Sequence, residues 1–162
     1  MVNIAKELNS KKLSKTETVI YDFSRTSISS TGGFNYRDVM VDGDIFNQIG
    51  NSIIRSGSPY QINPLIKTAA GEEYVVQCSR ISFSKASSTS NTNTVFSVSA
   101  TIHLISKKHN KTYKKVFSTS TSRNIGSNTP VVVSRDAYNA VLDGLGERMV
   151  IWTNNRLYKL NK

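Results

Sequence analysis

The stretch Thr94-Val-Phe-Ser-Val-Ser-Ala-Thr-Ile-His-Leu-Ile105 decides the fold, because apolar and polar residues alternate along it. The apolar series is Phe96, Val98, Ala100, Ile102 and Leu104, and the polar series is Ser97, Ser99, Thr101 and His103. A period of two residues is typical of a β-strand that packs one face on a core and turns the other toward solvent. The stretch therefore predicts a strand at the boundary between a core and a polar surface.

Two neighbouring segments extend this strand into a sheet. In residues 74–85, Ile81 and Phe83 share one face, while Cys78, Arg80, Ser82 and Ser84 share the opposite face. Residues 112–121 form the third segment, and the polar loops 86–93 and 107–111 join the three as hairpins. We therefore expect an antiparallel meander.

Two further segments show the spacing of helices. Asp44 is suited to an N-cap and Gly57 to the position after a helix end, so we expect a helix at 44–56. Ser134 is suited to cap a second helix, at 134–155, in which Gly144 and Gly146 each cost about 1 kcal/mol relative to alanine. We expect a bend or break at these two glycines.

The remaining segments complete a single α+β domain over residues 1–162. Alternation in residues 18–24 predicts a strand, and Val131–Val133 predict a brief one. Residues 1–16 contain four lysines and are expected to form a basic N-terminal arm. The sheet is thus expected within 17–133, with the inserted helix 44–56 packed on or near it and the C-terminal helix following at 134–155.

The charge balance favours an anionic partner. Lys and Arg number 21 against 11 for Asp and Glu, which gives a net charge of +10. Such a surplus favours nucleic acid or an anionic membrane surface. Cys78 is the only cysteine in the sequence, which excludes a disulfide within the chain. The sequence shows no signal peptide and no transmembrane segment, so we expect a soluble protein that is not exported, unless a leader has been removed.

The residue types that commonly perform catalysis form no recognisable site. His103 lies on the polar face of a predicted strand and His109 in a lysine-rich loop, without a cysteine or a pair of carboxylates at metal-ligand spacing. Cys78 is expected to be a small buried residue and not a nucleophile. We therefore expect no enzymatic activity, no cofactor, no metal ion and no small-molecule substrate.

The polar face of the predicted sheet is the candidate binding surface. If the three strands lie side by side, they form one field of cations and hydroxyl groups: Arg80, Ser82, Ser97, Ser99, Thr101, His103 and Lys114. Basic side chains neutralise phosphates and hydroxyl groups donate hydrogen bonds to them, so this face is suited to a polyphosphate backbone. The alternative is an ordinary solvated sheet face.

The order of elements resembles the coat proteins of single-stranded RNA bacteriophages. The matching stretches are Tyr74-Val-Val-Gln-Cys-Ser-Arg-Ile-Ser-Phe-Ser84, Val95-Phe-Ser-Val-Ser-Ala-Thr-Ile-His-Leu104 and Ser134-Arg-Asp-Ala-Tyr-Asn-Ala-Val-Leu142. The resemblance implies a capsid protein of the virion or host cytoplasm that binds genomic RNA on its sheet. It also implies a homodimer or larger shell, in which the C-terminal helix packs on a second subunit through Tyr138, Val141, Leu142, Leu145, Met149 and Trp152.

A second resemblance leads to another class of protein. The order strand, helix, strands, helix is similar to that of small periplasmic lipoproteins that accompany lipid-transport machines, in which a helix pair packs on one face of an antiparallel sheet. This resemblance implies a membrane-anchored accessory subunit with its leader removed and a lipidated cysteine. A third interpretation is another small, basic nucleic-acid-binding protein.

Overall fold

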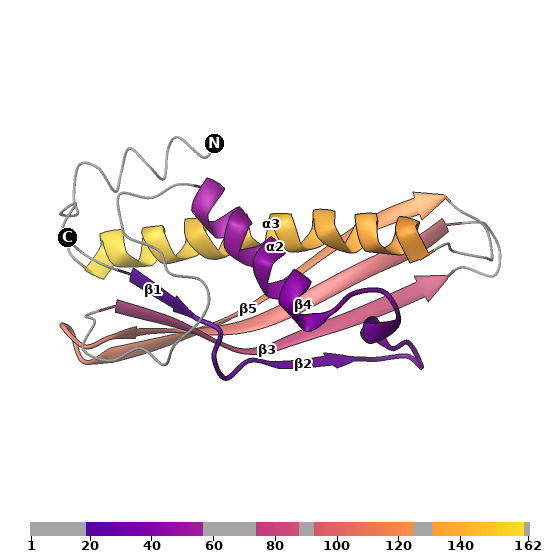
Figure 1. The fold of residues 1–162 in the computed structure, drawn as a ribbon. Coiled ribbons are helices and arrows are strands. Elements are labelled where there is room, and N and C mark those ends of the chain that lie inside the picture. The colour runs from indigo at the N-terminus through magenta and orange to yellow at the C-terminus, as the bar shows by residue number, and fades with distance from the viewer. Residues whose placement is uncertain (1–18, 57–73, 88–92, 125–130, 161–162) are drawn as a thin grey trace.

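A sheet with two helices on one of its faces makes up the part of the chain that the structure describes, residues 19–56, 74–87, 93–124 and 131–160 of a computed structural model. Figure 1 shows α2 and α3 on the same side of the sheet, with α2 crossing over α3. This arrangement confirms the predicted α+β class, with one internal and one C-terminal helix. The elements in chain order are β1 (Val19–Asp22), β2 (Ser27–Ser30), the short 3-10 helix η1 (Tyr36–Asp38), α2 (Asp42–Arg55), β3 (Tyr74–Ser87), β4 (Asn93–Ser106), β5 (Lys111–Asn124) and α3 (Val131–Leu160).

The predicted meander is confirmed, because β3, β4 and β5 pair in sequence order and antiparallel. Ala100 of β4 lies opposite Ile81 of β3 and Phe117 of β5, so apolar residues of the three strands meet on one face. This face carries the apolar series of β4, all of it buried under the helices. The alternation in the sequence therefore reflects one covered and one uncovered side of the sheet.

The edge of the sheet beyond β3 differs from the prediction, because two short strands share it. β1 pairs with the start of β3 and β2 with its middle, both in parallel, so the sheet is mixed. A β-bulge between Cys78 and Arg80 separates the two pairings, and the Thr26 hydroxyl donates to the Cys78 carbonyl at 2.8 Å. The bulge marks the point where one strand leaves the edge and the next one joins it.

Tyr138 anchors α3 to the sheet. Its ring makes edge contacts with Phe83 and Phe96, each with ring centroids 5.2 Å apart, and its hydroxyl donates to the Ser84 carbonyl at 2.7 Å. A buried tyrosine is stable in a core when its hydroxyl has such an acceptor. The helix therefore packs on the sheet of its own chain.

The six residues that were expected to contact a second subunit belong to this same core. Tyr138, Val141, Leu142, Leu145 and Met149 are at most 4% exposed in the single chain. Trp152 is half-buried, with its ring centroid 6.2 Å from that of Phe117. The large apolar residues of α3 are thus explained by its own sheet, without a second subunit.

The bounds of both helices differ from the prediction. α3 begins at Val131, so the brief strand predicted at Val131–Val133 is wrong, and it continues past residue 155. Valine favours strands, but by only about 1 kcal/mol or less, and this preference depends on packing against a neighbouring strand. No described strand pairs with this segment, so the helix prevails. α2 begins before Asp44, which lies in its first turn, where a carboxylate favours the helix dipole. The predicted basic arm, 1–16, lies outside the described residues.

The expected bend at the glycines is also absent, because α3 passes through Gly144 and Gly146 as one helix. A Cβ atom on Gly146 would lie 2.6 Å from the Ser52 hydroxyl oxygen of α2. Gly146 therefore allows the two helices to approach closely. At this contact the Ser52 hydroxyl donates to the Asp143 carbonyl, and Arg55 forms an ion pair with the Asp143 carboxylate.

Candidate functional site

The uncovered face of the sheet holds all seven residues of the candidate binding surface. Arg80 lies opposite Thr101, Ser82 opposite Ser99, and His103 opposite Lys114; Ser97 lies on the same face. These side chains alternate with the buried series, so they lie on the sheet face opposite the one that α2 and α3 cover. The residues thus share one face as expected, and their role in binding stays a prediction.

Hydroxyl groups dominate this face, and charge does not. Ser29, Ser82, Ser99 and Ser118 form one row across β2, β3, β4 and β5. In β2, β3, β4 and β5, the registers place only two Lys or Arg residues on this face, Arg80 and Lys114. Two cations account for little of the net charge of +10, so the surplus must lie elsewhere.

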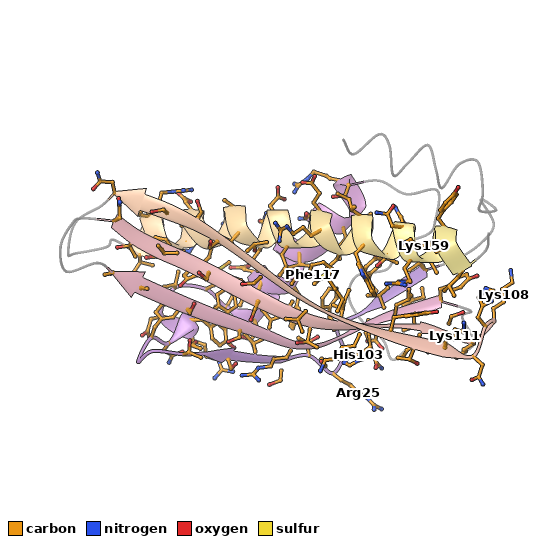
Figure 2. All side chains as sticks on the ribbon, turned by 180° about the vertical axis from the view of Figure 1, so that it is seen from behind. Arg25, His103, Lys108, Lys111, Phe117 and Lys159 are labelled. Carbon is orange, nitrogen blue, oxygen red and sulfur yellow. The ribbon has the colours of Figure 1, made fainter. Side chains whose placement is uncertain are left out.

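One end of the molecule gathers much of the positive charge of the described residues. It combines the turn between β4 and β5, the start of β5 and the last turns of α3, and Figure 2 shows Lys108, Lys111 and Lys159 together there. We call this surface the basic end. Its members are Lys107, Lys108, Lys111, Lys114, Lys115, Arg156 and Lys159.

Local geometry fixes the basic end. In the turn, Asn110 adopts a φ of 53°, a left-handed conformation that asparagine tolerates better than most residues. The His109 N–H donates to the Ser106 hydroxyl at 3.1 Å. On the helix side, the Arg156 guanidinium lies 4.8 Å from the centre of the Tyr113 ring of β5, which ties α3 to the start of that strand. Lysines from the hairpin are thereby presented beside the cations of α3.

The acidic residues of the described part lie away from this end, except for Asp22 of β1. Asp22 is in register with Gln77, His103 and Lys114, but it is buried. The described acidic residues are on β1, η1, α2 and α3 before residue 148: Asp22, Asp38, Asp42, Asp44, Asp136, Asp143 and Glu147. Two of them form ion pairs, Asp42 with Arg37 at 3.8 Å and Asp143 with Arg55. Among the described residues, the exposed charge is therefore largely segregated, and the exposed side chains of the basic end are of one sign.

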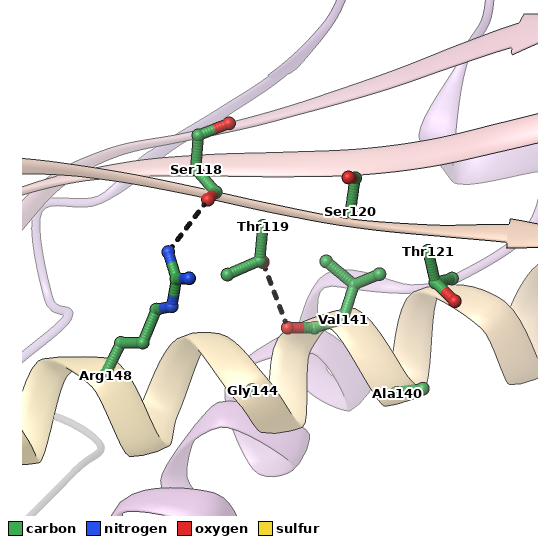
Figure 3. Close-up of a pocket in the computed structure, with 8 residues that line it drawn as sticks. All are labelled: Ser118, Thr119, Ser120, Thr121, Ala140, Val141, Gly144 and Arg148. Atoms are coloured by element: carbon green, nitrogen blue, oxygen red, sulfur yellow. Dashed lines mark hydrogen bonds between the residues drawn. The ribbon is translucent and has the colours of Figure 1, made fainter.

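A groove between β5 and α3 is a second candidate site, in addition to the basic end. It consists of two hollows of about 440 and 400 Å³ that share Ser118 and Arg148. Between them the Arg148 guanidinium donates to the Ser118 carbonyl at 3.2 Å, and Thr119 donates to the Val141 carbonyl at 3.3 Å (Figure 3). One hollow is rich in Ser and Thr, and the other includes Ile151 and Trp152.

The groups that were weighed as catalytic lie apart from this groove. Cys78 is buried, and burial raises the pKa of its thiol to about 12, so it stays protonated and unreactive at neutral pH. His103 lies on the uncovered face, with its Nε2 atom 3.4 Å from the Ser79 hydroxyl. Among the described residues there is no group of His, Cys, Asp or Glu that could hold a metal ion.

Comparisons with solved structures show the fold. Protein XCC0632 from Xanthomonas campestris, of the family DUF330, is similar with a TM-score of 0.57 and 11% identity over 89% of this chain and 88% of that one. A putative lipoprotein from Caulobacter crescentus has a TM-score of 0.46 and 10% identity over 86% and 93% of the two chains. Lipoprotein GNA1162 from Neisseria meningitidis has a TM-score of 0.40 and 16% identity over 88% and 99%. No family model and no curated protein matches the sequence.

These findings correct the class of protein. The chain shares the α+β fold of XCC0632, and the resemblance to coat proteins of RNA bacteriophages is wrong. The predictions of a capsid protein and a virion location that followed from it are wrong as well, and the comparisons give no support to RNA binding. The physical reason lies in α3, which covers the sheet of its own chain, whereas coat-protein helices cover a partner's sheet.

The sequence showed part of the site. The lysines of residues 107–115 were visible as a connecting loop, but only the antiparallel course of β5 and α3 brings Arg156 and Lys159 to them. The groove was missed, because it depends on how α3 lies along β5. Of the lysines in β5, the registers place Lys114 on the uncovered face and Lys111 and Lys115 on the helix side.

Proposed function

We propose that this chain is a non-enzymatic, lipoprotein-type accessory subunit that works at a membrane and binds its anionic surface through the basic end. The single observation that carries the proposal is the convergence of seven Lys and Arg residues from two distant segments on one end of the molecule. The helix pair on one sheet face supports it as well, because this is the arrangement expected for accessory lipoproteins.

Electrostatic attraction is the membrane contact that the described residues provide. No helix among them is long and apolar enough to cross a bilayer. Cys78 is 2% exposed in the core, so a lipid attached to it would have to displace packed side chains. Each Lys or Arg near an anionic membrane surface contributes about 1 kcal/mol, and the attraction falls off over a Debye length of about 10 Å at 0.1 M salt.

Sedimentation with vesicles tests the proposal. The protein is expected to sediment with vesicles of phosphatidylglycerol at low salt and to remain in solution with vesicles of phosphatidylcholine. Replacing Lys107, Lys111 and Lys114 by glutamine removes about 3 kcal/mol of attraction, so binding should weaken about a hundredfold.

A second triple variant is the matched control. Arg37→Gln, Lys85→Gln and Arg123→Gln remove the same charge from η1 and from the end of the sheet away from the turn between β4 and β5. This control should keep most of the binding. Equal losses in both variants would show that net charge alone matters, and an absence of binding to phosphatidylglycerol at low salt would contradict the proposal outright.

A further inference from the structure

The outer edge of β5 has no neighbouring strand in the described sheet, which ends there. We propose that this edge binds an extended, acidic segment of a partner protein, which adds to the sheet as a further strand beside β5. This inference does not rest on the proposed membrane contact, because it uses the middle of β5 and the groove; only Lys115 belongs to both surfaces.

The sequence in the middle of β5 lacks the usual protective features of an edge strand. Natural edges are blunted by charges, prolines, bulges or short length. β5 is 14 residues long, and its pairing with β4 runs without a bulge. Residues 116–122, Val-Phe-Ser-Thr-Ser-Thr-Ser, contain neither a charge nor a proline, while Lys115 and Arg123 flank them. An unprotected stretch of this length is a template for strand addition.

The backbone of this stretch presents its polar groups to the edge. The Ser118 carbonyl accepts from Arg148 and the Ser122 carbonyl from Arg123, at 3.2 Å each, so both point away from β4. In an antiparallel pair the N–H and C=O groups of alternate residues point to the same side, which places those of Ser120 at the edge too. The two guanidinium groups occupy acceptors that an added strand would use.

The groove beside the edge can accept side chains of the added strand. Alternate residues of such a strand point toward α3, where the hollow of about 400 Å³ is lined by Phe117, Ile151 and Trp152 among others. Val116 is 55% exposed beside it. An incoming strand with apolar residues at every second position would place them over the hollow, while its other side chains would lie beside Val116 on the uncovered face.

Charge determines which strand fits. Lys115 and Arg148 line the groove, and no acidic residue does. A second copy is disfavoured, because antiparallel pairing of β5 with itself about Thr119 would place Lys115 opposite Arg123, and like charges at opposite positions repel. The occupant is therefore an acidic segment of another protein.

Fluorescence anisotropy with a labelled peptide tests the inference. The probe is a peptide of about ten alternating glutamate and valine residues, the length of an ordinary strand. Two control peptides are one with lysine for glutamate and one with methylated backbone nitrogens. The protein should bind the acidic peptide and neither control; equal binding of the methylated peptide, or no binding of the acidic one, would overturn the inference.

Variants of the protein separate strand addition from charge. Ser120→Pro removes an N–H at the edge, where proline is tolerated, so thermal unfolding should show a folded protein with binding weakened about tenfold or more. Arg148→Glu should weaken binding similarly, whereas Arg80→Glu, the same charge change on the uncovered face, should not. Unchanged binding in folded Ser120→Pro would overturn the inference, as would a concentration-dependent dimer of the protein that Ser120→Pro abolishes.

Discussion

Gly146 and Gly144 form a matched pair that tests the contact between α2 and α3. A Cβ atom on Gly146 would lie 2.6 Å from the hydroxyl oxygen and 2.7 Å from the Cβ of Ser52, and 3.0 Å from the Ile49 carbonyl oxygen. Such overpacking costs about 1 to 3 kcal/mol. Around Gly144, nothing lies within 4 Å of the added atom. Replacement of either glycine by alanine stabilises the helix by about 1 kcal/mol through its higher helix propensity.

The two alanine variants are therefore expected to move in opposite directions. Gly144→Ala should raise the free energy of unfolding by about 1 kcal/mol, and Gly146→Ala should lower it by up to about 2 kcal/mol. Urea denaturation followed by circular dichroism measures both. Adding Ser52→Gly removes the two nearest atoms, so it should recover part of the loss in Gly146→Ala. If Gly146→Ala were as stable as Gly144→Ala, the close approach of the helices would be refuted.

Three further predictions concern the core. Leu145→Ala should lower the free energy of unfolding by about 2 to 5 kcal/mol at every protein concentration, because Leu145 is buried within its own chain. A loss that depended on protein concentration would instead indicate that Leu145 packs in an interface between subunits. Tyr138→Phe leaves the Ser84 carbonyl without its donor, so the free energy of unfolding measured by urea denaturation should fall by about 1 kcal/mol. No loss would show that the Tyr138 hydroxyl is solvated. Burial raises the pKa of Cys78 from 9.0 to about 12, so its contribution to stability is complete below pH 9 and is lost as the pH rises toward 12. Denaturation at a series of pH values should show this decline, with a smaller slope in Cys78→Ala; equal slopes would contradict it.

The sequence predicted those elements whose patterns are local. The alternation in β4 reports one covered face directly, and its partners in β3 and β5 follow from short polar connections. The uncovered side of Arg80, Ser99 and Lys114 follows from the same period. The same period placed Cys78 on that side too, which is wrong, because the bulge between Cys78 and Arg80 leaves Cys78 on the buried face. These features depend on the backbone of single strands, so the residues themselves specify them.

The features that were missed depend on contacts between distant segments. Ser27–Ser30 resembles a turn by composition, yet it forms a strand because the bulge in β3 leaves a free stretch of edge beside it. Val131 and Val132 favour strands by type but are exposed at the start of a helix whose stability comes from packing further along. The basic end likewise exists only because α3 runs back toward the turn between β4 and β5.

The most direct test of the proposed function asks which surface of the protein meets the membrane. Gadolinium chelated to lipid headgroups in phosphatidylglycerol vesicles broadens the NMR signals of amides near the membrane. We expect the strongest broadening at Lys107–Lys111 and at the end of α3, with little effect at Ser82 and Ser99 on the uncovered sheet face. Broadening centred on that face, or spread evenly over the molecule, would contradict binding through the basic end.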